Sequence, residues 1–230
     1  MKKKDCVNGD SDTFCGNVQN DRNQSMREAK IFDEIYQNYL EKILNLDRLW
    51  LRDRLAVEIH DTDIIMPFYG VTYRICPEGI TDGQGCRPSH SVSVILCKYL
   101  LLCPENEPTE ADWVTYKDFK DAAPFFEGFL NNAQRPISRN FAGRLEDLRK
   151  ACAELTGSPI QAEISADLVM KLDALPKVPV LLVFNDRDED FPAHCSLLFE
   201  RRAEKYLDME CLAMTGWALS EWLKQRASKY

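Results

Sequence analysis

The chain has 230 residues, of which 45% are hydrophobic and 29% are charged, and its formal net charge is −8. With aromatic residues at 10%, this composition supplies enough apolar surface for a core and excludes a wholly disordered or collagen-like chain. The acidic balance argues against nucleic acid and anionic membrane surfaces as partners, because affinity for both depends on Lys and Arg side chains.

Residues 1–24 are polar and carry no hydrophobic period, so we expect a flexible tail followed by a single domain over residues 25–230. The chain starts Met1-Lys2-Lys3-Lys4, but the apolar segment that a secretory signal requires does not follow. The strongest apolar run, residues 178–184, is much shorter than the ~20 residues of a membrane-spanning helix. We therefore expect a soluble cytoplasmic protein with reduced thiols, which suits its odd count of nine cysteines.

The first half of the domain is expected to start with helices and continue into strands. Apolar residues recur at helical spacing from Phe32 to Ile43, which predicts an amphipathic helix, and residues 48–55 continue it after a break. Three short β-rich runs predict an antiparallel meander, at residues 56–60, 63–66 and 70–75. Residues 76–88 are expected to be a loop, and residues 89–102 a helix that stops before Pro104.

The second half mixes short strands with helices. We expect helices at residues 124–132 and 138–155, the latter ended by Gly157, and a short strand at residues 113–116. The run at 178–184 predicts a central strand buried on both faces. Further strands are expected near 168–170 and 194–199. The last helix should start near Asp208 and run to the end of the chain, and it carries Leu212, Ala213, Trp217 and Leu223. The predicted class is α+β, with a mostly antiparallel sheet flanked by helices.

The cysteines do not form a zinc-finger pattern, because no C-x-x-C pair exists among them. Cys97, Cys152 and Cys211 lie in helical apolar patterns, where a free thiol acts as a small core hydrophobe. Cys6 and Cys15 lie in the expected tail, where we expect no structural role for them.

The loop from Cys76 to His90 is a candidate ligand or metal site. Cys86 and His90 are four residues apart at a helix start, and Cys76 opens the same loop. A glycine-rich loop before a helix also presents backbone N–H groups to an anion, with Arg87 beside it. The phosphate-loop motif is absent, and an ordinary turn with a helix cap is the favoured alternative.

Two other polar segments deserve the same comparison. His60, Asp61 and Asp63 end a strand, where carboxylates could orient an imidazole for proton transfer or metal binding; a turn is the favoured alternative. Asp188 and Asp190 alternate with Asp186 as in a calcium loop, but the EF-hand glycine and terminal glutamate are missing. Solvated turn charges are therefore the favoured interpretation of that segment.

Together these segments define a predicted binding surface, on the condition that folding brings them together. The predicted ligand contacts are His60, Asp61, Asp63, Arg87, Asp188 and Asp190. The predicted metal ligands are Cys76, Cys86, His90 and His194. The leading hypothesis is a non-catalytic protein that binds a small molecule or a protein partner, with an unidentified cofactor. The alternatives are a metal-dependent enzyme with a Cys/His/Asp site and a structural interaction module; no G-x-S-x-G elbow supports a hydrolase.

Residues 178–207, which begin with the predicted central strand, resemble a known family. Along the chain they read Val178-Pro179-Val180, an apolar strand, Asp188-Glu189-Asp190-Phe191-Pro192, Leu197-Leu198-Phe199 and Tyr206-Leu207. This order resembles an uncharacterised family of cytoplasmic proteins from anaerobic bacteria and archaea, over roughly residues 57–223. Some relatives carry a further iron–sulfur domain with four clustered cysteines, which implies a setting in corrinoid or iron–sulfur metabolism. The N-terminal tail of this chain has only Cys6 and Cys15, so it holds no four-cysteine cluster of its own. The resemblance implies no particular reaction.

Overall fold

A computed structural model describes residues 31–161 and 164–228. Contacts divide the chain into two compact units, Met1–Asn38 and Tyr39–Tyr230. Residues 31–38 of the first unit and residues 39–44 of the second are helical, as the apolar spacing predicts. The predicted tail at residues 1–24 lies outside the described residues, and a single domain over residues 25–230 stays a prediction.

The second unit continues with α2 (Arg48–Leu55), whose first turn is capped by Asp47, which accepts hydrogen bonds from the N–H groups of Leu49 and Trp50. The predicted meander follows as an antiparallel sheet of four strands in the described residues, ordered β1-β2-β3-β4. Its strands are β1 (Glu58–His60), β2 (Asp63–Phe68), β3 (Val71–Cys76) and β4 (Gly79–Asp82). β4 lies in a region that was expected to be a loop.

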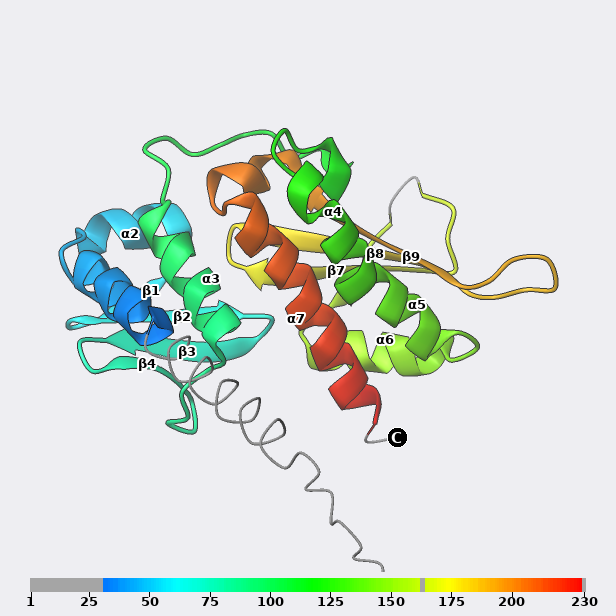
Figure 1. Ribbon diagram of the computed structural model, residues 1–230, viewed down its shortest axis with the longest axis horizontal. Coiled ribbons are helices and arrows are strands. Elements are labelled where there is room, and N and C mark those ends of the chain that lie inside the picture. The colour runs from blue at the N-terminus through cyan, green and yellow to red at the C-terminus, as the bar shows by residue number, and fades with distance from the viewer. Residues whose placement is uncertain (1–30, 162–163, 229–230) are drawn as a thin grey trace, which may run out of the picture. The chain divides into compact units, whose positions relative to one another are not determined.

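A second antiparallel sheet of the described residues has the order β5-β9-β8-β7-β6 (Figure 1). Its strands are β5 (Trp113–Thr115), β6 (Ser158–Pro159), β7 (Leu168–Leu175), β8 (Val178–Asn185) and β9 (His194–Glu200). The prediction of a buried central strand is confirmed, because β8 lies between β9 and β7 and is buried from Val178 to Phe184. The α+β class is likewise confirmed, although the strands form two sheets where one was expected.

The two sheets are joined through a turn of the first. The N–H of Tyr69, at the β2–β3 turn, donates to the carbonyl of Ala174 in β7 at 3.1 Å. The phenol of Tyr69 is fully buried and donates to the carbonyl of Thr215 at 3.1 Å. Both the N–H and the hydroxyl of Tyr69 therefore have hydrogen-bond partners, as buried polar groups require. The second bond fixes the turn against the last helix.

The helical layer of the second half centres on α7 (Met209–Ala227). Around it lie α3 (His90–Leu101), α4 (Ala123–Phe129), the π-helical turn η2 (Leu130–Gln134), α5 (Arg135–Phe141) and α6 (Leu145–Glu154), all of which contact it. The predicted start at Asp208 is confirmed, because its carboxylate caps α7 through the N–H of Cys211. Short 3₁₀ turns, η1 (Tyr116–Asp118) and η3 (Arg201–Lys205), complete the layer.

The prediction of one continuous helix over residues 138–155 is wrong. α5 ends at Phe141 and α6 begins at Leu145, because Gly143 between them has a φ of +73°, in the left-handed region that favours glycine. No helix of the described residues is both long enough and apolar enough to cross a membrane.

Candidate functional site

The segment from His60 to Asp63 is a hairpin turn in the structure. Asp61 has a φ of +55°, and Asp63 accepts a hydrogen bond from the Arg74 guanidinium at 2.6 Å. The imidazole of His60 is exposed and its Nε2 lies 3.3 Å from a carboxylate oxygen of Glu58. The arrangement matches the turn interpretation, since the side chains of His60 and Asp63 have local structural partners and Asp61 adopts the left-handed conformation of a tight turn.

The loop after Cys76 uses its own backbone donors internally. Asp82 accepts hydrogen bonds from the N–H groups of Gln84 at 2.9 Å and Cys86 at 2.8 Å, and the Gly85 N–H donates to the Asp82 carbonyl at 3.0 Å. These N–H groups are therefore not available to cradle an anion. Cys76 is buried, which raises the pKa of its thiol.

The sheet register separates the ends of this loop. Cys76 pairs with Gly79 at the end of the sheet that also holds the β1–β2 turn, whereas Asp82 pairs with Tyr73 nearer the β2–β3 turn. Cys86 and the exposed Arg87 follow Asp82. They lie toward the opposite end of the sheet from His60, because each strand residue advances the chain by about 3.3 Å.

The acidic segment belongs to the other sheet. The loop between β8 and β9 projects from the end of the five-stranded sheet that lies away from β1–β4 (Figure 1). Asp188 accepts hydrogen bonds from the N–H groups of Asp190 at 2.9 Å and Phe191 at 2.7 Å. His194 starts β9, with Nε2 3.1 Å from the hydroxyl of Ser196. The predicted surface that joined three segments is thus not assembled as one site.

The predicted metal ligands are not gathered either. Within residues 31–161 and 164–228, no group of three or more His, Cys, Asp or Glu side chains is placed to hold a metal ion. His90 is exposed at the first position of α3, and Cys86 is exposed in the loop before it. The roles of these residues in binding stay predictions.

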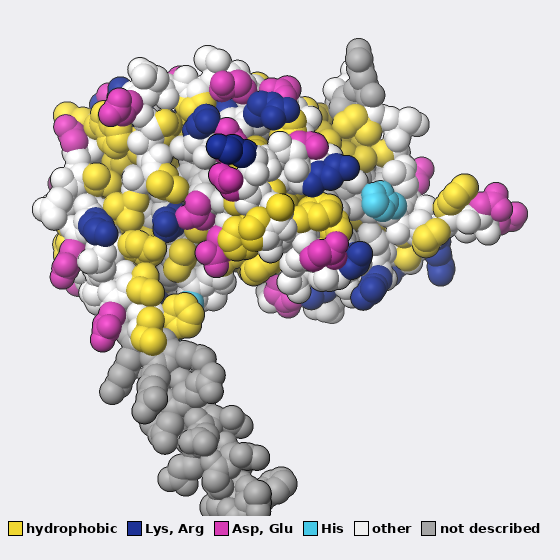
Figure 2. All heavy atoms as spheres, turned by 45° about the horizontal axis from the view of Figure 1, so that its top comes forward, with side chains coloured by type: hydrophobic (Ala, Val, Ile, Leu, Met, Phe, Trp, Pro, Cys, Tyr) yellow, Lys and Arg dark blue, Asp and Glu magenta, His cyan; other side chains and the backbone are white. Residues whose placement is uncertain are grey.

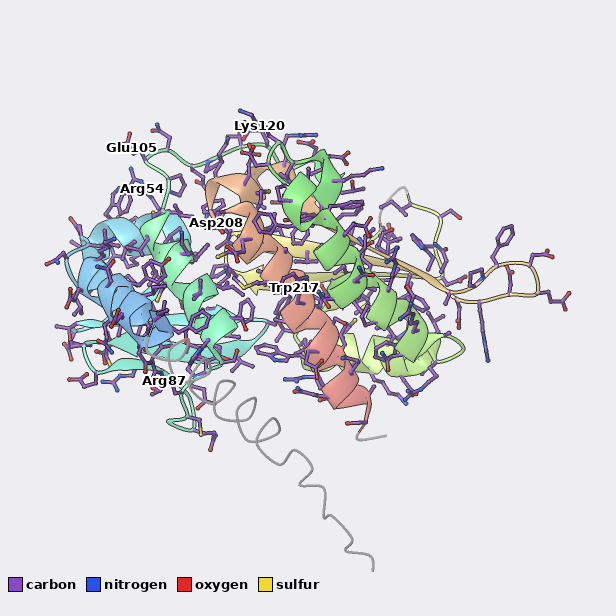
Figure 3. All side chains as sticks on the ribbon, in the orientation of Figure 1. Arg54, Arg87, Glu105, Lys120, Asp208 and Trp217 are labelled. Carbon is purple, nitrogen blue, oxygen red and sulfur yellow. The ribbon has the colours of Figure 1, made fainter. Side chains whose placement is uncertain are left out.

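The structure instead shows a groove of about 420 Å³ between α3, the η2–α5 segment and α7. Its lining residues are Ser89, Ser91, Val92, Asn132, Pro136, Met214, Trp217, Ala218, Glu221, Trp222 and Lys224. We call this feature the α3–α7 groove. Figure 3 labels Trp217 midway along α7.

Helix α7 presents two different faces. The residues packed into the core include Leu212, Gly216, Leu219 and Leu223. The groove residues Met214, Trp217, Ala218, Glu221 and Trp222 recur at helical spacing of three and four, so they lie along a second face. Trp217, which the sequence places in the last helix with Leu212, is half-buried and borders the groove.

The two indoles of the groove are held by packing on their other sides. Trp217 lies against Gly128 of α4, where an added Cβ would be 3.5 Å from its Cζ2, and its buried Nε1 has no hydrogen-bond partner among the described residues. Trp222 packs edge-on against Phe68 at 5.3 Å between ring centroids. Rings fixed in this way present apolar surface with little conformational freedom left to lose on binding.

The ionisable side chains that line the groove neutralise each other. Lys224 and Glu221 form an ion pair at 2.6 Å, and this hydrogen bond from Lys224 lowers the pKa of Glu221. The hydroxyls of Ser89 and Ser91 lie 3.3 Å apart at the α3 end. The described lining of the groove thus mixes apolar and polar side chains, and it holds no carboxylate or ammonium without a counter-charge.

One wall of the groove contains the π-helical turn. Pro136 has no N–H, and its ring would clash with the carbonyl of Asn132 in a regular α-helix. The chain avoids the clash by forming η2 directly before α5, and both residues line the groove. Such insertions are frequent at functional sites. The sequence signal is Pro136 itself, which lies between the helices predicted at residues 124–132 and 138–155.

A larger depression of about 560 Å³ lies at the start of α7. Three of its six charged residues have partners: Asp208 bonds to Lys98 at 3.0 Å and caps α7, and Glu204 bonds to Lys205 at 2.8 Å. Lys120 and Asp208, labelled in Figure 3, both belong to its lining. With half of its ionic side chains committed in this way, we regard the depression as a weaker candidate than the α3–α7 groove.

Comparison with known proteins gives a family and no function. No curated protein and no solved structure matches the chain. One family model matches residues 50–222, a span that includes every lining residue of the α3–α7 groove except Lys224. Because this match covers most of the chain, the protein belongs to the family described as a domain of unknown function, DUF3786.

Proposed function

We propose that this chain is a non-catalytic binding protein that recognises an apolar side chain or segment of a protein partner in the α3–α7 groove. The observation that carries the proposal is the second face of α7, on which Met214, Trp217 and Trp222 border a groove rather than the core. Tryptophan is enriched at binding hot spots, because a large ring can be desolvated at low entropic cost.

The chemistry of the lining supports binding over catalysis at this site. Glu221 and Lys224 are the ionisable residues among the described lining, and each has the other as its partner. An acid or base for proton transfer requires a pKa shifted toward neutrality, whereas the ion pair lowers the pKa of Glu221 away from it. A metal-dependent enzyme that uses Cys76, Cys86, His90 or His194 stays an alternative proposal.

A peptide selection tests the groove directly. A library of random linear peptides displayed on phage is selected on the full chain, and enriched peptides are measured by fluorescence polarisation. We expect peptides with aromatic or aliphatic anchors, and at least a tenfold loss of their affinity in Ala218→Phe, because the added ring fills the groove.

The matched control is Gln225→Phe. It adds the same ring to α7 at an exposed position that is not part of the groove lining, so peptide affinity should stay within twofold of the parent. Enriched peptides that bind Ala218→Phe as well as the parent would refute the proposed function.

The cellular setting is a separate proposal. A cytoplasmic location and a role in anaerobic corrinoid or iron–sulfur metabolism rest on the resemblance of residues 178–207 alone. The groove adds to this only that a protein segment is a better-supported occupant than a charged small molecule, since the ionic groups of its lining pair with each other.

A further inference from the structure

The tip of the β8–β9 hairpin carries an unusual side chain. Phe191 is 70% exposed, more than any other large hydrophobic residue that the structure describes. Its conformation is fixed, because Asp188 accepts hydrogen bonds from the N–H groups of Asp190 and Phe191, and the Asp188 N–H donates to the Phe191 carbonyl at 3.0 Å. The loop therefore presents a phenyl ring that pays little ordering cost on binding.

The charges around this ring lack counter-charges. Glu189 and Asp190 directly precede Phe191, and neither carboxylate has an ion-pair partner among the described residues. Figure 2 shows this projection with hydrophobic and acidic side chains together at its end. An occupant for the tip would thus combine an apolar pocket with a cation at the rim.

The α3–α7 groove offers the apolar surface, and Arg226, which is not part of its lining, lies beside it over Trp222. Its lining includes the apolar side chains of Met214, Trp217 and Trp222. The guanidinium of Arg226 lies 5.8 Å from the centre of the Trp222 ring and has no carboxylate partner among the described residues. The tip and the groove are therefore complementary in two respects: an exposed apolar ring faces apolar lining residues, and unpaired carboxylates face a guanidinium.

We propose that the β8–β9 tip of one copy inserts Phe191 into the α3–α7 groove of a second copy, with Glu189 or Asp190 facing Arg226. The inference rests on the proposed function of the groove and names its occupant. The contact is head-to-tail, so it leaves one tip and one groove available for another copy. A single side chain in a groove gives a small interface, so the association is weak and depends on concentration.

Sedimentation equilibrium of the full chain, from about 10 µM to 1 mM, measures the association. We expect the average mass to rise above the 26.5 kDa of one chain, and to rise less at high salt because the rim charges are screened. Phe191→Ser and Ala218→Phe should each stay at the mass of one chain over this range. Phe191→Leu should keep the association, because it preserves an apolar anchor, and so should Gln225→Phe.

Mixing the two inactive variants gives the decisive result. Phe191→Ser keeps an intact groove and Ala218→Phe keeps an intact tip, so an equimolar mixture should form a 1:1 dimer and no larger species. Ser91→Trp, at an exposed position of the groove lining, replaces Ala218→Phe if that variant fails to fold.

The inference is overturned if the parent stays at the mass of one chain over the whole concentration range. It is also overturned if Phe191→Ser associates as strongly as the parent. A mixture of the two variants that remains at the mass of one chain overturns it as well. In each case the peptide selection decides separately whether the groove binds a protein segment, so failure here and failure of the proposed function remain distinguishable.

Discussion

The ring of Phe129 lies directly against Gly216 of α7. A Cβ placed on Gly216 would be 2.5 Å from Cε2 of the ring and 3.2 Å from the Cβ of Ala133. Phe129 also stacks on Tyr116 at 4.4 Å between ring centroids and is fully buried. The close approach of α7 to the end of α4 and to η2 therefore depends on the absence of a side chain at residue 216, and this approach positions the floor of the groove.

Gly216→Ala is expected to destabilise the fold in spite of the higher helix propensity of alanine. The methyl group would overlap a buried ring that has little room to move, which costs about 1–3 kcal/mol. Urea unfolding followed by circular dichroism measures the change in free energy of unfolding.

Gly128→Ala is the matched control for this variant. An added Cβ at residue 128 would be 3.5 Å from Cζ2 of Trp217, an ordinary contact, within helix α4. We expect unchanged or higher stability, by up to about 1 kcal/mol from helix propensity. Equal losses for the two variants would contradict the role given to Gly216.

The ion pair between Lys98 and Asp208 predicts a dependence of stability on pH. Burial acts to raise the pKa of Asp208, but hydrogen bonds from the Cys211 N–H and the Lys98 ammonium outweigh it and hold that pKa below the ordinary 3.8. The same pair raises the pKa of Lys98 above its ordinary 10.5. A lowered carboxyl pKa adds stability that is lost as the pH falls through it, and a raised amine pKa adds stability that is lost as the pH rises through it.

Asp208→Asn isolates this contribution, because asparagine still caps a helix but cannot pair with a cation. The parent should exceed the variant by up to about 1 kcal/mol at pH 7, since both side chains are partly exposed. The difference should shrink below pH 3.8 and again above pH 10.5. Urea unfolding across the pH range gives the curve; a difference that is constant with pH would contradict the ion-pair argument.

Sequence patterns predict an element best when all of its residues have the same surroundings, for example when all are buried. β8 is recognisable because every residue from Val178 to Phe184 is apolar and buried. The break at Gly143 was missed, because the apolar spacing of the preceding helix continues in register across it, from Phe141 to Leu148, both buried. The turn is visible only in the structure, where Gly143 has a φ of +73° and the Arg144 N–H donates to the Phe141 carbonyl.

The groove was beyond sequence reasoning for a different reason. Its walls come from α3, the η2–α5 segment and α7, whose lining residues are at least 40 residues apart along the chain, as Val92 and Asn132 are. Trp217 fits the apolar spacing of a core stripe, and only the packing of the other walls leaves it half-exposed. Local patterns identify an apolar face, whereas long-range contacts determine what covers it.

The described thiols should differ sharply in reactivity. Cys86 is exposed and the other six are buried. Burial raises the pKa of Cys97 and of Cys152 to about 12 and that of Cys103 to about 11, which removes the reactive thiolate at neutral pH. In a Cys6→Ser/Cys15→Ser chain at pH 8, Ellman's reagent should titrate one thiol rapidly, and seven in denaturant.

Cys86→Ser provides the control for this titration. In the same background it should abolish the rapid phase and leave six thiols in denaturant, with no change in the circular dichroism spectrum. Two or more rapid thiols in the parent would mean that a buried cysteine is accessible in the native state, which the packing of these residues does not allow.

Asp186 should be the carboxylate of the acidic segment that matters most for stability. It accepts hydrogen bonds from the N–H groups of Gly143 at 2.6 Å and Arg187 at 2.7 Å, and so ties the α5–α6 turn to the end of β8. Asp186→Ala removes two charge-assisted hydrogen bonds, and we expect the free energy of unfolding measured in urea to fall by about 1–2 kcal/mol.

Asp190→Ala, in the same loop, is the control. It removes a carboxylate without an ion-pair partner among the described residues and should change stability by less than about 0.5 kcal/mol. Amide hydrogen exchange distinguishes this tether from a general charge effect, because only Asp186→Ala should accelerate exchange at Gly143; equal exchange in the two variants would show that the tether does not hold the turn.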